Sequence, residues 1–489
     1  MTSPDPTPYP LDHLALRGSP DAPALTVGEV TISFAELDDA VGRNAAHLLA
    51  LGLSKGDRVA IWMGKTMLAC VLPLAAARAG LIHVPINPVL RRAQAAHILA
   101  DSGAKLLIAN QARLDSLEDG DLAAARPAAL EGWLAPGPAL PPSSHDPNAL
   151  CTLLYTSGST GRPKGVMLSH ANLWLGAVSV AYYLGLGPSD RTLAVLPLAF
   201  DYGQNQLLAG WYAGGSVIPL DYLMPGEVVR AIRRHDVTIL AGVPPLWLQL
   251  ADAEWGDVGT SLTTLTNSGG HLPEPLVRRL RHAFPQARLH LMYGLTEAFR
   301  SSSLDPALVD AHPDSIGTAI PFADLAVMRP DRTEVAPGEE GELVHGGPLV
   351  AHGYWNDPIR TAERFRDGRV WSGDTVVRGH DGLLRFRARD DAMIKVSGNR
   401  LSPTEIEEAA LASGAVSQAL AIGVPDALLG QAVLLIAVAR QDQAEERLRA
   451  YFKRELPAFM HPREIVWRDK FPLNSNGKID RKTLVKEHK

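Results

Sequence analysis

Short hydrophobic runs alternate with amphipathic stretches along the first half of the chain. This pattern predicts strands at 30–34, 57–63 and 81–85, and helices that run from the end of the first strand to residue 53 and over 67–80. A strand, a helix and a strand follow one another again at 217–219, 225–235 and 237–241. Strands that alternate with helices of this length predict parallel βαβ units.

The C-terminal part of the chain shows a different pattern. A helix is expected directly after Ser402, whose hydroxyl can cap it, and short strands are expected at 416–423 and 432–439. An amphipathic helix over 444–456 follows the second strand. The charged run 387–392 precedes these elements and has no apolar periodicity. We therefore expect a small α+β unit of about a hundred residues, with its boundary near this run.

Composition narrows the protein class only moderately. The 489 residues are 46% hydrophobic and 20% charged, and the net charge of −6 argues against a general nucleic-acid binder. The longest apolar run, 67–77, is far shorter than the ~20 residues that cross a bilayer, so we expect no membrane span. Cys70 and Cys151 both lie in apolar runs, which favours buried free thiols and a cytoplasmic protein. The acidic, proline-rich N-terminus does not resemble a signal peptide.

The segment 156–165, TSGSTGRPKG, combines glycines, hydroxyl side chains and a lysine. Glycine lets backbone N–H groups approach a ligand closely, and successive N–H groups form a concavity that binds anions. Lys164 adds a positive charge, and the apolar segment 149–155 before the loop predicts a buried strand. Because α/β sheets bind ligands at strand ends, this loop predicts a polyphosphate site.

The loop differs from two other phosphate-binding loops. No Gly-Lys-Ser/Thr sequence occurs in it, as a P-loop requires, and the spacing of Gly158, Gly161 and Gly165 does not give the dinucleotide fingerprint. A flexible Gly/Ser surface loop is the purely structural alternative. The basic residues at the end of the loop and the buried strand before it favour the phosphate site.

Three further segments carry candidate chemistry. The segment 291–297, LMYGLTE, presents Glu297, and Mg²⁺ is normally held by one or two carboxylates together with substrate phosphates. The segment 370–375, VWSGDT, presents Asp374, and the segment 471–481, FPLNSNGKIDR, presents Lys478. Taken singly, the segment 291–297 is equally consistent with a strand end followed by a helix cap. For the other two segments taken singly, a β-turn and a solvated lysine near the C-terminus are the favoured interpretations.

Together the motifs give a specific resemblance. YTSGSTGRPKGVMLSH resembles the phosphate loop of the AMP-forming adenylating enzymes, which include acyl-CoA synthetases, stand-alone adenylation domains and luciferases. The other motifs follow in the order that this superfamily shows, and the resemblance covers residues from about 31 to 482. Gly353-Tyr354, Pro358 and Thr361 also match the superfamily and are interpreted as structural.

The resemblance implies a role for each matching residue. Lys478 would bridge the attacking carboxylate and the α-phosphate, and Glu297 would hold the metal. Thr296 would bond the α-phosphate, Tyr293 would lie against the purine, and Asp374 would bind the ribose hydroxyls. The implied catalytic residues are Lys478, Thr296 and Glu297, and the implied nucleotide-binding residues are Thr156, Ser157, Gly158, Ser159, Thr160, Gly161, Lys164, Gly269, Gly270, Tyr293, Asp374 and Arg389.

A two-domain α/β architecture is also implied. A large N-terminal domain of stacked βαβ layers, 1–388, would bind ATP and the acyl group, and residues 389–391 would form a hinge at Asp391. A small α+β domain, 392–489, would rotate about this hinge. After the rotation, the loop that contains Lys395, Ser397 and Gly398 would face the thiol acceptor.

The resemblance further implies a reaction in two steps. A carboxylic acid attacks the α-phosphate of ATP, pyrophosphate leaves, and an acyl-adenylate forms. A thiol then attacks the acyl carbon and AMP departs. The expected cofactors are ATP, Mg²⁺ and either CoA or the phosphopantetheine of an acyl or peptidyl carrier protein, and CoA is the acceptor that we expect first.

The identity of the acid depends on the expected acyl pocket. Asp201 follows Phe200, and this Phe-Asp pair resembles the pair with which amino-acid-activating relatives bind the substrate ammonium group. Alternatively, Asp201 bonds Tyr202 or the backbone and only shapes the pocket. Arg300 is a candidate for contacting an acidic group of the substrate, or it is a surface residue. The residues expected to line the pocket are Phe200, Asp201, Tyr202, Gln206, Val243, Trp247 and Phe299.

Two ligase hypotheses therefore remain open, with an acyl-CoA synthetase ahead of a stand-alone enzyme that loads an amino acid onto a carrier protein. An inactive scaffold or ATP sensor is disfavoured, because Lys478, Glu297 and Asp374 are all present. A luciferase-type oxygenase is a remote further alternative.

Overall fold

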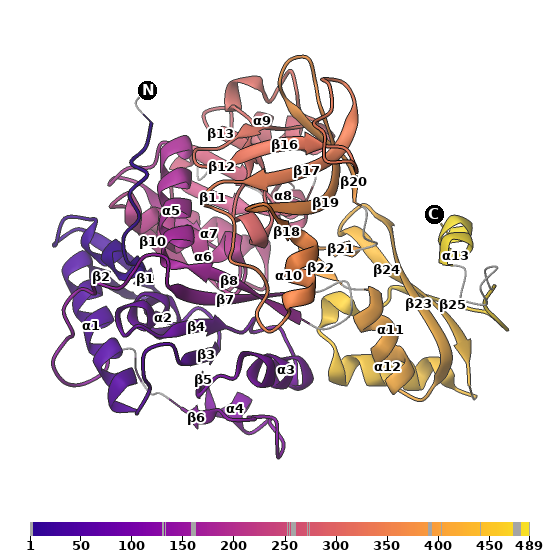
Figure 1. The fold of residues 1–489 in the computed structure, drawn as a ribbon, viewed down its shortest axis with the longest axis horizontal. Helices are drawn as coiled ribbons and strands as arrows, with labels where there is room; N and C mark the ends of the chain where they lie inside the picture. Colours follow the sequence, from indigo (N-terminus) through magenta and orange to yellow (C-terminus); the bar gives the residue numbers. More distant parts are fainter. Residues whose placement is uncertain are drawn as a thin grey trace.

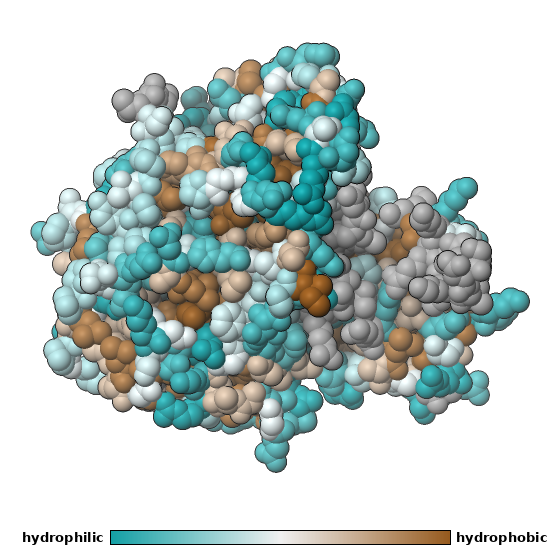
Figure 2. Space-filling model, viewed as in Figure 1, coloured by the Kyte–Doolittle hydropathy of each residue, from teal (hydrophilic) through white to brown (hydrophobic). Residues whose placement is uncertain are grey.

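The computed structural model describes the chain in several stretches. These are residues 3–129, 132, 134–157, 163–251, 253, 255, 261–270, 272, 274–389, 394–401, 403–440, 442–472 and 481–488. Figure 1 shows a large body, coloured from indigo to orange, and a smaller yellow lobe formed by the C-terminal residues. The face drawn in Figure 2 is mostly hydrophilic, with hydrophobic residues in small separate groups. In the part of the chain that the structure describes, every helix is too short or too polar to cross a membrane.

One sheet of the large body has six strands in the order β6-β5-β3-β4-β7-β8. Its strands are β3 Arg58–Trp62, β4 Ile82–Pro85, β5 Leu106–Ala109, β6 Arg126–Ala128, β7 Leu150–Ser157 and β8 Pro163–Ser169. The helices that accompany it are α1 Phe34–Ala50, α2 Met67–Arg78, α3 Arg92–Ser102 and α4 Gln111–Leu114. The pairs β3–β4, β3–β5, β5–β6 and β4–β7 are parallel, as the alternation of strands and helices predicts.

The connection at the predicted phosphate loop differs from expectation in one respect. Strand β7 pairs with β8 in antiparallel register, and Ser157 lies opposite Pro163. The loop therefore joins two paired strands of a hairpin, whereas the sequence was consistent with an ordinary strand end of a parallel sheet. The sheet fixes the flanks of the loop on both sides.

A larger sheet passes through the rest of the body in the order β16-β17-β19-β20-β15-β14-β13-β12-β11-β9-β10-β1-β2. Its central strands β9 Arg191–Ala194, β10 Ser216–Pro219, β11 Ile239–Gly242, β12 Thr264–Asn267 and β13 Arg288–Tyr293 pair in parallel. The flanking strands β1 Pro23–Val27 and β2 Val30–Ser33 form an antiparallel hairpin. The helices of this region are α5 His170–Leu184, α6 Asp201–Tyr212, α7 Pro225–His235, α8 Pro244–Ala251 and α9 Glu274–Ala283.

The other end of this sheet is antiparallel. It consists of β14 Ser302–Ser303, β15 Ser315–Ala319, β16 Asp324–Met328, β17 Glu340–Gly346, β18 Phe365–Arg366, β19 Arg369–Arg378 and β20 Leu384–Arg389, with helix α10 Pro358–Arg364 beside it. Short 3-10 turns lie at η1 Leu11–Leu16, η3 Thr296–Ala298 and η4 Pro306–Leu308. These antiparallel strands were not predicted, because their apolar runs are interrupted by turns and carry little periodicity.

The small lobe is built on its own sheet and has its own hydrophobic core. Strands β21 Ile394–Val396, β22 Asn399–Leu401, β23 Val416–Asp426, β24 Gly430–Ala439 and β25 Glu464–Trp467 form the sheet. The remaining elements are α11 Pro403–Ala412, α12 Ala444–Glu455, η5 Ala458–Met460 and α13 Arg481–His488. The expectation of two short strands was wrong in length, because β23 and β24 pair as far as Asp426 and Gly430 and so include polar residues at the turn.

Local chemistry explains where the helices of the large body begin. Ser33 caps α1, since its hydroxyl accepts from the Glu36 backbone N–H while the Glu36 carboxylate accepts from the Ser33 N–H at 2.7 Å.

Helix α2 is buried along its whole length, in agreement with its nearly continuous apolar sequence. Cys70 and Cys151 are both free and buried, as predicted, and burial raises the pKa of each thiol to about 12.

Helix α6 begins at Asp201 and packs closely against the segment before it. A Cβ atom added at Gly203 would lie 2.0 Å from the carbonyl oxygen of Pro197, which is backbone and cannot move aside cheaply. Only glycine allows α6 to start at this position, so Gly203 helps to position the side chain of Asp201.

We predict that Gly203→Ala lowers the free energy of unfolding by about 1–3 kcal/mol, because the new methyl group must push the helix away from Pro197. Gly226→Ala is the matched control. It also lies within a helix, but its Cβ would be 3.5 Å from the flexible end of Arg230, so stability should stay equal or rise. Urea unfolding of the two variants measures the difference, and equal midpoints would contradict this account of α6.

Candidate active site

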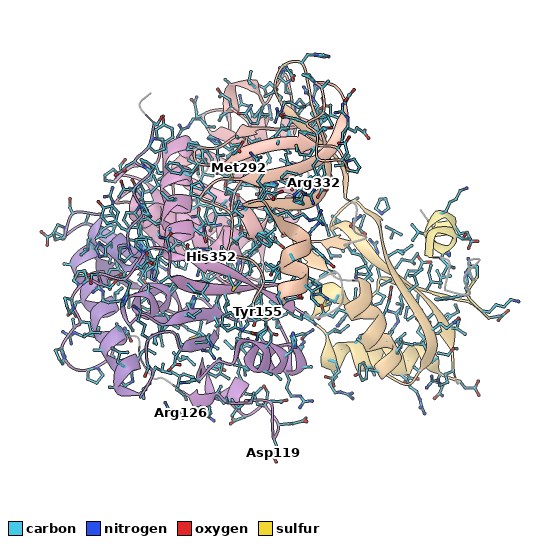
Figure 3. The ribbon with its side chains drawn as sticks, viewed as in Figure 1. Asp119, Arg126, Tyr155, Met292, Arg332 and His352 are labelled. Atoms are coloured by element: carbon cyan, nitrogen blue, oxygen red, sulfur yellow. The ribbon has the colours of Figure 1, made fainter. Side chains whose placement is uncertain are left out.

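A cavity of about 390 Å³ lies where the large body meets the small lobe. Residues from β7, from the segment before α6 and from the turn after β13 line one side of it. Figure 3 labels Tyr155, one of the lining residues, close to the small lobe. Its lining includes Thr156, Phe200, Asp201, Val243, Gly269, Thr296 and Arg300 from the body, and Ser397, Gly398 and Glu405 from the lobe.

The predicted phosphate end of the site is only partly described. Gly158, Ser159, Thr160 and Gly161 lie outside the described residues. Thr156 lines the cavity, and its hydroxyl is buried without a hydrogen-bond partner among the residues that the structure describes. A buried hydroxyl with no partner is rare, so this donor is available to a ligand oxygen.

A compact charge cluster lies beside this end. The ammonium nitrogen of Lys164 is 3.4 Å from a carboxylate oxygen of Glu297. The same nitrogen lies 3.8 Å from the centre of the Tyr354 ring, and the Tyr354 hydroxyl donates to Glu297 Oε1 at 2.7 Å. The cluster therefore joins the expected phosphate lysine to the expected metal carboxylate.

Tyr354 is a site residue that sequence reasoning had interpreted only as structural. Its hydroxyl fixes the orientation of Glu297, and burial, reinforced by the neighbouring carboxylate, raises the pKa of the phenol. The phenol thus stays protonated and continues to donate. The Gly353-Tyr354 motif was the available signal, but a motif alone does not show which side chain a tyrosine contacts.

Asp374 and Tyr293, which are expected to bind the nucleotide, lie next to each other. Asp374 lies on β19, and the Tyr293 hydroxyl at the end of β13 donates to its carboxylate at 2.5 Å. The backbone of Asp374 pairs with that of Arg389 on β20, so the two residues lie opposite each other in the sheet. His345 stacks on Tyr293 with ring centroids 5.9 Å apart, and burial lowers the pKa of this histidine to about 3. A neutral imidazole therefore supports the tyrosine ring.

The Ser-Gly-Gly segment follows β12 and reaches the cavity through one of its two glycines. Gly269 lines the cavity, and a Cβ added there would lie 3.5 Å from Val243 and 3.7 Å from Phe200. The carbonyl oxygen of Gly270 accepts from the Asn267 side chain at 3.1 Å. This bond holds the turn in place beside the cavity.

The β21–β22 hairpin of the small lobe closes over the cavity. Ser397 and Gly398 form its turn, with φ angles of 51° and 80°. A Cβ added to Gly398 would lie 2.9 Å from the Val243 side chain, so only glycine allows so close an approach of the lobe to the body. A second contact between the lobe and the body is the bond from the Gln94 amide to Glu405 at 3.3 Å. Lys395 lies on β21, where its ammonium group is 5.0 Å from the centre of the Phe386 ring.

At the acyl end, Asp201 forms a buried ion pair. Arg300 Nη1 donates to Asp201 Oδ2 at 3.4 Å, and Thr296 donates to Asp201 Oδ1 at 3.2 Å. The side chains of Asp201 and Arg300 are each only 3% exposed. Burial raises the pKa of Asp201, while the Arg300 charge acts in the opposite direction. Arg300 is thus a buried partner of Asp201, and the alternative that it is a surface residue was wrong.

The other residues expected in the acyl pocket divide into two groups. Phe200 and Val243 line the main cavity, whereas Tyr202 and Gln206 line a smaller one beside it. Trp247 and Phe299 are fully packed in hydrophobic cores, Trp247 against Gly242 and Phe299 against Gly176. Large aromatic side chains in an apolar sequence do not reveal whether they face a cavity or the core.

Two further expected functional residues cannot be placed. Lys478 and Asp391 lie outside the described residues, and so does the rest of the Lys478 motif from residue 473 to 480. Ser157 and Arg389 are described in their strands, without their side chains.

Comparison with known proteins agrees with this geometry. A family model described as AMP-binding enzyme matches residues 13–355, and a model of the AMP-binding enzyme C-terminal domain matches residues 405–478. The chain belongs to the AMP-binding enzyme family. The resemblance inferred from the sequence motifs is thus confirmed, as is the mixed α/β fold with a large N-terminal and a smaller C-terminal domain.

Similar proteins of this family act on different acids. A feruloyl-CoA synthase from Amycolatopsis sp is 35% identical over 477 residues, which cover 95% of each chain. An L-proline–[L-prolyl-carrier protein] ligase from Pseudomonas fluorescens is 31% identical over 493 residues, which cover 97% of each chain. The structure of an o-succinylbenzoate CoA synthetase variant from Bacillus subtilis superimposes with a TM-score of 0.85, with 27% identity and 98% of each chain covered.

The family and these relatives establish the reaction class. The chain is an AMP-forming acid–thiol ligase, which activates a carboxylic acid as an acyl-adenylate and transfers the acyl group to a thiol. Both hypotheses about the acceptor, CoA and a carrier protein, are consistent with the relatives.

We predict that Gly398→Ala lowers thioester formation about tenfold or more and leaves acid-dependent ATP–pyrophosphate exchange largely intact, because its methyl group would clash with Val243 and prevent the hairpin from closing. Gly414→Ala is the control, since Gly414 also lies in the small lobe at a positive φ of 70° but has no atom within 4 Å of its added Cβ. Equal losses in both variants would attribute the effect to backbone strain and contradict the importance of the contact.

Proposed function

We propose that the protein is an acid–CoA ligase in which one cavity serves both steps of the reaction. The observation that carries this proposal is the β21–β22 hairpin, whose turn lines the same cavity as Thr156 of the expected phosphate end and Asp201 of the acyl end. A pantetheine chain that enters this cavity can pass close to the backbone of Gly398, which has no side chain. The relative that is 35% identical is a feruloyl-CoA synthase, and its name gives CoA as the acceptor.

In the first step, the acid's carboxylate oxygen attacks the α-phosphorus and pyrophosphate leaves with the bonding electron pair. Lys164 and the loop from Thr156 to Gly161 hold the leaving phosphates, and Thr296 contacts the α-phosphate. Support comes from the unpartnered hydroxyl of Thr156 and from the position of Thr296 on the cavity wall. Held in this geometry, the reactants need little further ordering, which supplies much of the rate enhancement.

On the nucleotide side, we assign Asp374 and Arg389 to the ribose and Tyr293 to the purine, with Gly269 and Gly270 along the base. The bond from Tyr293 to Asp374 supports this assignment, because it holds the carboxylate beside the turn that carries Thr296. A fixed carboxylate can accept both ribose hydroxyls without reorganising.

The residues present fit a Mg²⁺ ion that arrives with ATP. Among the described residues, no cluster of three or more His, Cys, Asp or Glu side chains could hold a metal ion by itself. Glu297 would supply one carboxylate, and substrate phosphates and water would supply the remaining ligands. The bound ion would neutralise phosphate charge. The chain's own contribution is to hold Glu297 in place through Tyr354.

For the second step, we propose that the small domain, 392–489, rotates about a hinge at residues 389–391, with Asp391 as the pivot. Lys478 then leaves the large domain, 1–388, and the loop at Lys395, Ser397 and Gly398 arrives. The thiol loses its proton, its sulfur attacks the acyl carbon, and AMP departs with the bonding pair. The separate core of the small lobe supports movement as a rigid unit.

A second candidate function is the loading of an amino acid onto a carrier protein. The Phe200-Asp201 pair and the 31% identical prolyl-carrier ligase favour it. Against it, both carboxylate oxygens of Asp201 already accept hydrogen bonds, from Thr296 and from Arg300. A substrate ammonium group would also lie next to the Arg300 charge.

We predict that Lys478→Ala lowers adenylate formation by about a hundredfold or more, because it removes a cation that stabilises charge as it develops on the α-phosphate. Thioester formation from synthetic acyl-adenylate and CoA should stay within a few-fold of wild type. Lys486→Ala, which changes an exposed lysine of α13, is the control and should leave both steps unchanged. A parallel loss of both steps in Lys478→Ala would refute the proposed division of labour.

A further inference from the structure

Behind the main cavity lies a small chamber of about 30 Å³. Arg300 lines both spaces, which therefore adjoin at its guanidinium group. Asn205 and Gln206, on the second turn of α6, also line the chamber, and Met292, labelled in Figure 3, forms part of its wall on the β13 side. Gln206 is one of the residues that the sequence predicted for the acyl pocket.

The polar side chains at this chamber are buried and incompletely bonded. Arg300, Asn205 and Gln206 are 2%, 3% and 7% exposed. Among the described residues, no hydrogen-bond partner is present for Arg300 Nη2, for Asn205 Nδ2, or for either polar atom of the Gln206 amide. Native proteins pair nearly all buried polar groups, so several such atoms around one space indicate that a ligand group completes their bonding.

The charges around the chamber restrict what this group can be. Arg300 is paired with Asp201 and lies 4.1 Å from the centre of the Tyr202 ring, so its positive charge is already compensated. A second carboxylate would be placed near Asp201, and an ammonium group near Arg300, and each like-charge contact is unfavourable in a buried site. A neutral oxygen avoids both contacts. Such an oxygen can accept two hydrogen bonds from Arg300 Nη2 and the amide nitrogens, and a hydroxyl can also donate to Gln206 Oε1.

The space limits the size of the group. A chamber of about 30 Å³ holds roughly one or two water molecules, which corresponds to a hydroxyl or a methoxy group. Its remaining walls include apolar side chains such as Val180, Ile239 and Ala241, which can accommodate a methyl carbon. Asp201 contacts both Thr296 and Arg300, so only one carboxyl group separates the expected α-phosphate contact from the polar chamber. The acid must therefore be compact.

We propose that Arg300, Asn205 and Gln206 select a compact acid that carries a neutral hydroxyl or ether oxygen at the end opposite its carboxyl group. This inference rests on the proposed function, because it places the acyl group at Asp201 and Thr296. It assigns the Asp201–Arg300 pair a positioning role. Asp201 holds the guanidinium so that Nη1 is engaged and Nη2 points to the substrate oxygen.

The test uses acid-dependent ATP–pyrophosphate exchange and thioester formation with the full-length protein. The acids are cinnamic acid, its 4-hydroxy, 4-hydroxy-3-methoxy and 4-carboxy derivatives, hexadecanoic acid and L-proline. We expect kcat/KM for the hydroxylated acids to exceed that for cinnamic acid about tenfold or more, because cinnamic acid leaves the polar atoms of the chamber unpaired. The 4-carboxy acid should be a poorer substrate than either hydroxylated acid.

Two variants locate the preference in the chamber. Gln206→Met retains the volume of the side chain and removes its amide, and Arg300→Lys retains the positive charge beside Asp201 and removes the second donor nitrogen, Nη2. Each should reduce the ratio of hydroxylated acid to cinnamic acid about tenfold, mainly through KM for the hydroxylated acid. Gln204→Met is the control, because Gln204 lies on the same helix and is equally buried but is not among the residues that line the chamber. It should leave the ratio unchanged.

The outcomes separate this inference from the proposed function. Exchange with cinnamic acid that equals exchange with the hydroxylated acids, or exchange only with hexadecanoic acid, L-proline or the 4-carboxy acid, would overturn the inference. Thioester formation with CoA in those cases would leave the proposed acid–CoA ligase intact. Exchange without any thioester on CoA would overturn the proposed acceptor, while a preference for the hydroxylated acids in the exchange reaction would still support the chamber.

Discussion

The 3-10 turn Thr296–Ala298 connects the acyl end of the site to the phosphate end. Its contacts involve two buried carboxylates, that of Asp201 and that of its own Glu297. Thr296 donates to Asp201 at the acyl end, and the neighbouring Glu297 accepts from Tyr354 and lies 3.4 Å from Lys164 at the phosphate end. The backbone oxygen of Glu297 also accepts from the Ala351 N–H at 2.8 Å, which ties the turn to the segment that carries Tyr354. Buried charges require such partners, so the turn has little freedom to move.

In the proposed mechanism, this constraint would keep the chemistry in one place while the small domain rotates. Among the described residues, the side chains at the expected phosphate, nucleotide and acyl ends come from the large body, whereas the lobe adds the glycine turn against Val243 and the bond between Glu405 and Gln94. Gly398 has no side chain, so its withdrawal from Val243 breaks no hydrogen bond at that point. The contact is sensitive to substitution of Gly398, because even one methyl group on this residue would prevent the turn from approaching Val243.

The sequence predicted those parts of the protein that depend on local pattern and on contiguous motifs. The parallel core strands follow from hydrophobic periodicity, and the phosphate loop, Glu297 and Asp374 lie in recognisable short segments. Contacts between distant segments were not accessible, since nothing local indicates that Tyr354 bonds Glu297 or that Arg300 pairs with Asp201. Trp247 and Phe299 show the same limit, because core and pocket aromatics look alike in sequence.

The most direct test of whether one cavity serves both steps is a rapid-quench experiment with one good acid substrate. It measures the release of pyrophosphate and of AMP over time. Without CoA, we expect a burst of one pyrophosphate per enzyme molecule and then almost no turnover, because the adenylate stays in the closed site. With CoA, we expect multiple turnovers in which AMP and thioester appear in equal amounts. Release of ADP, or steady turnover of equal rate with and without CoA, would contradict the account.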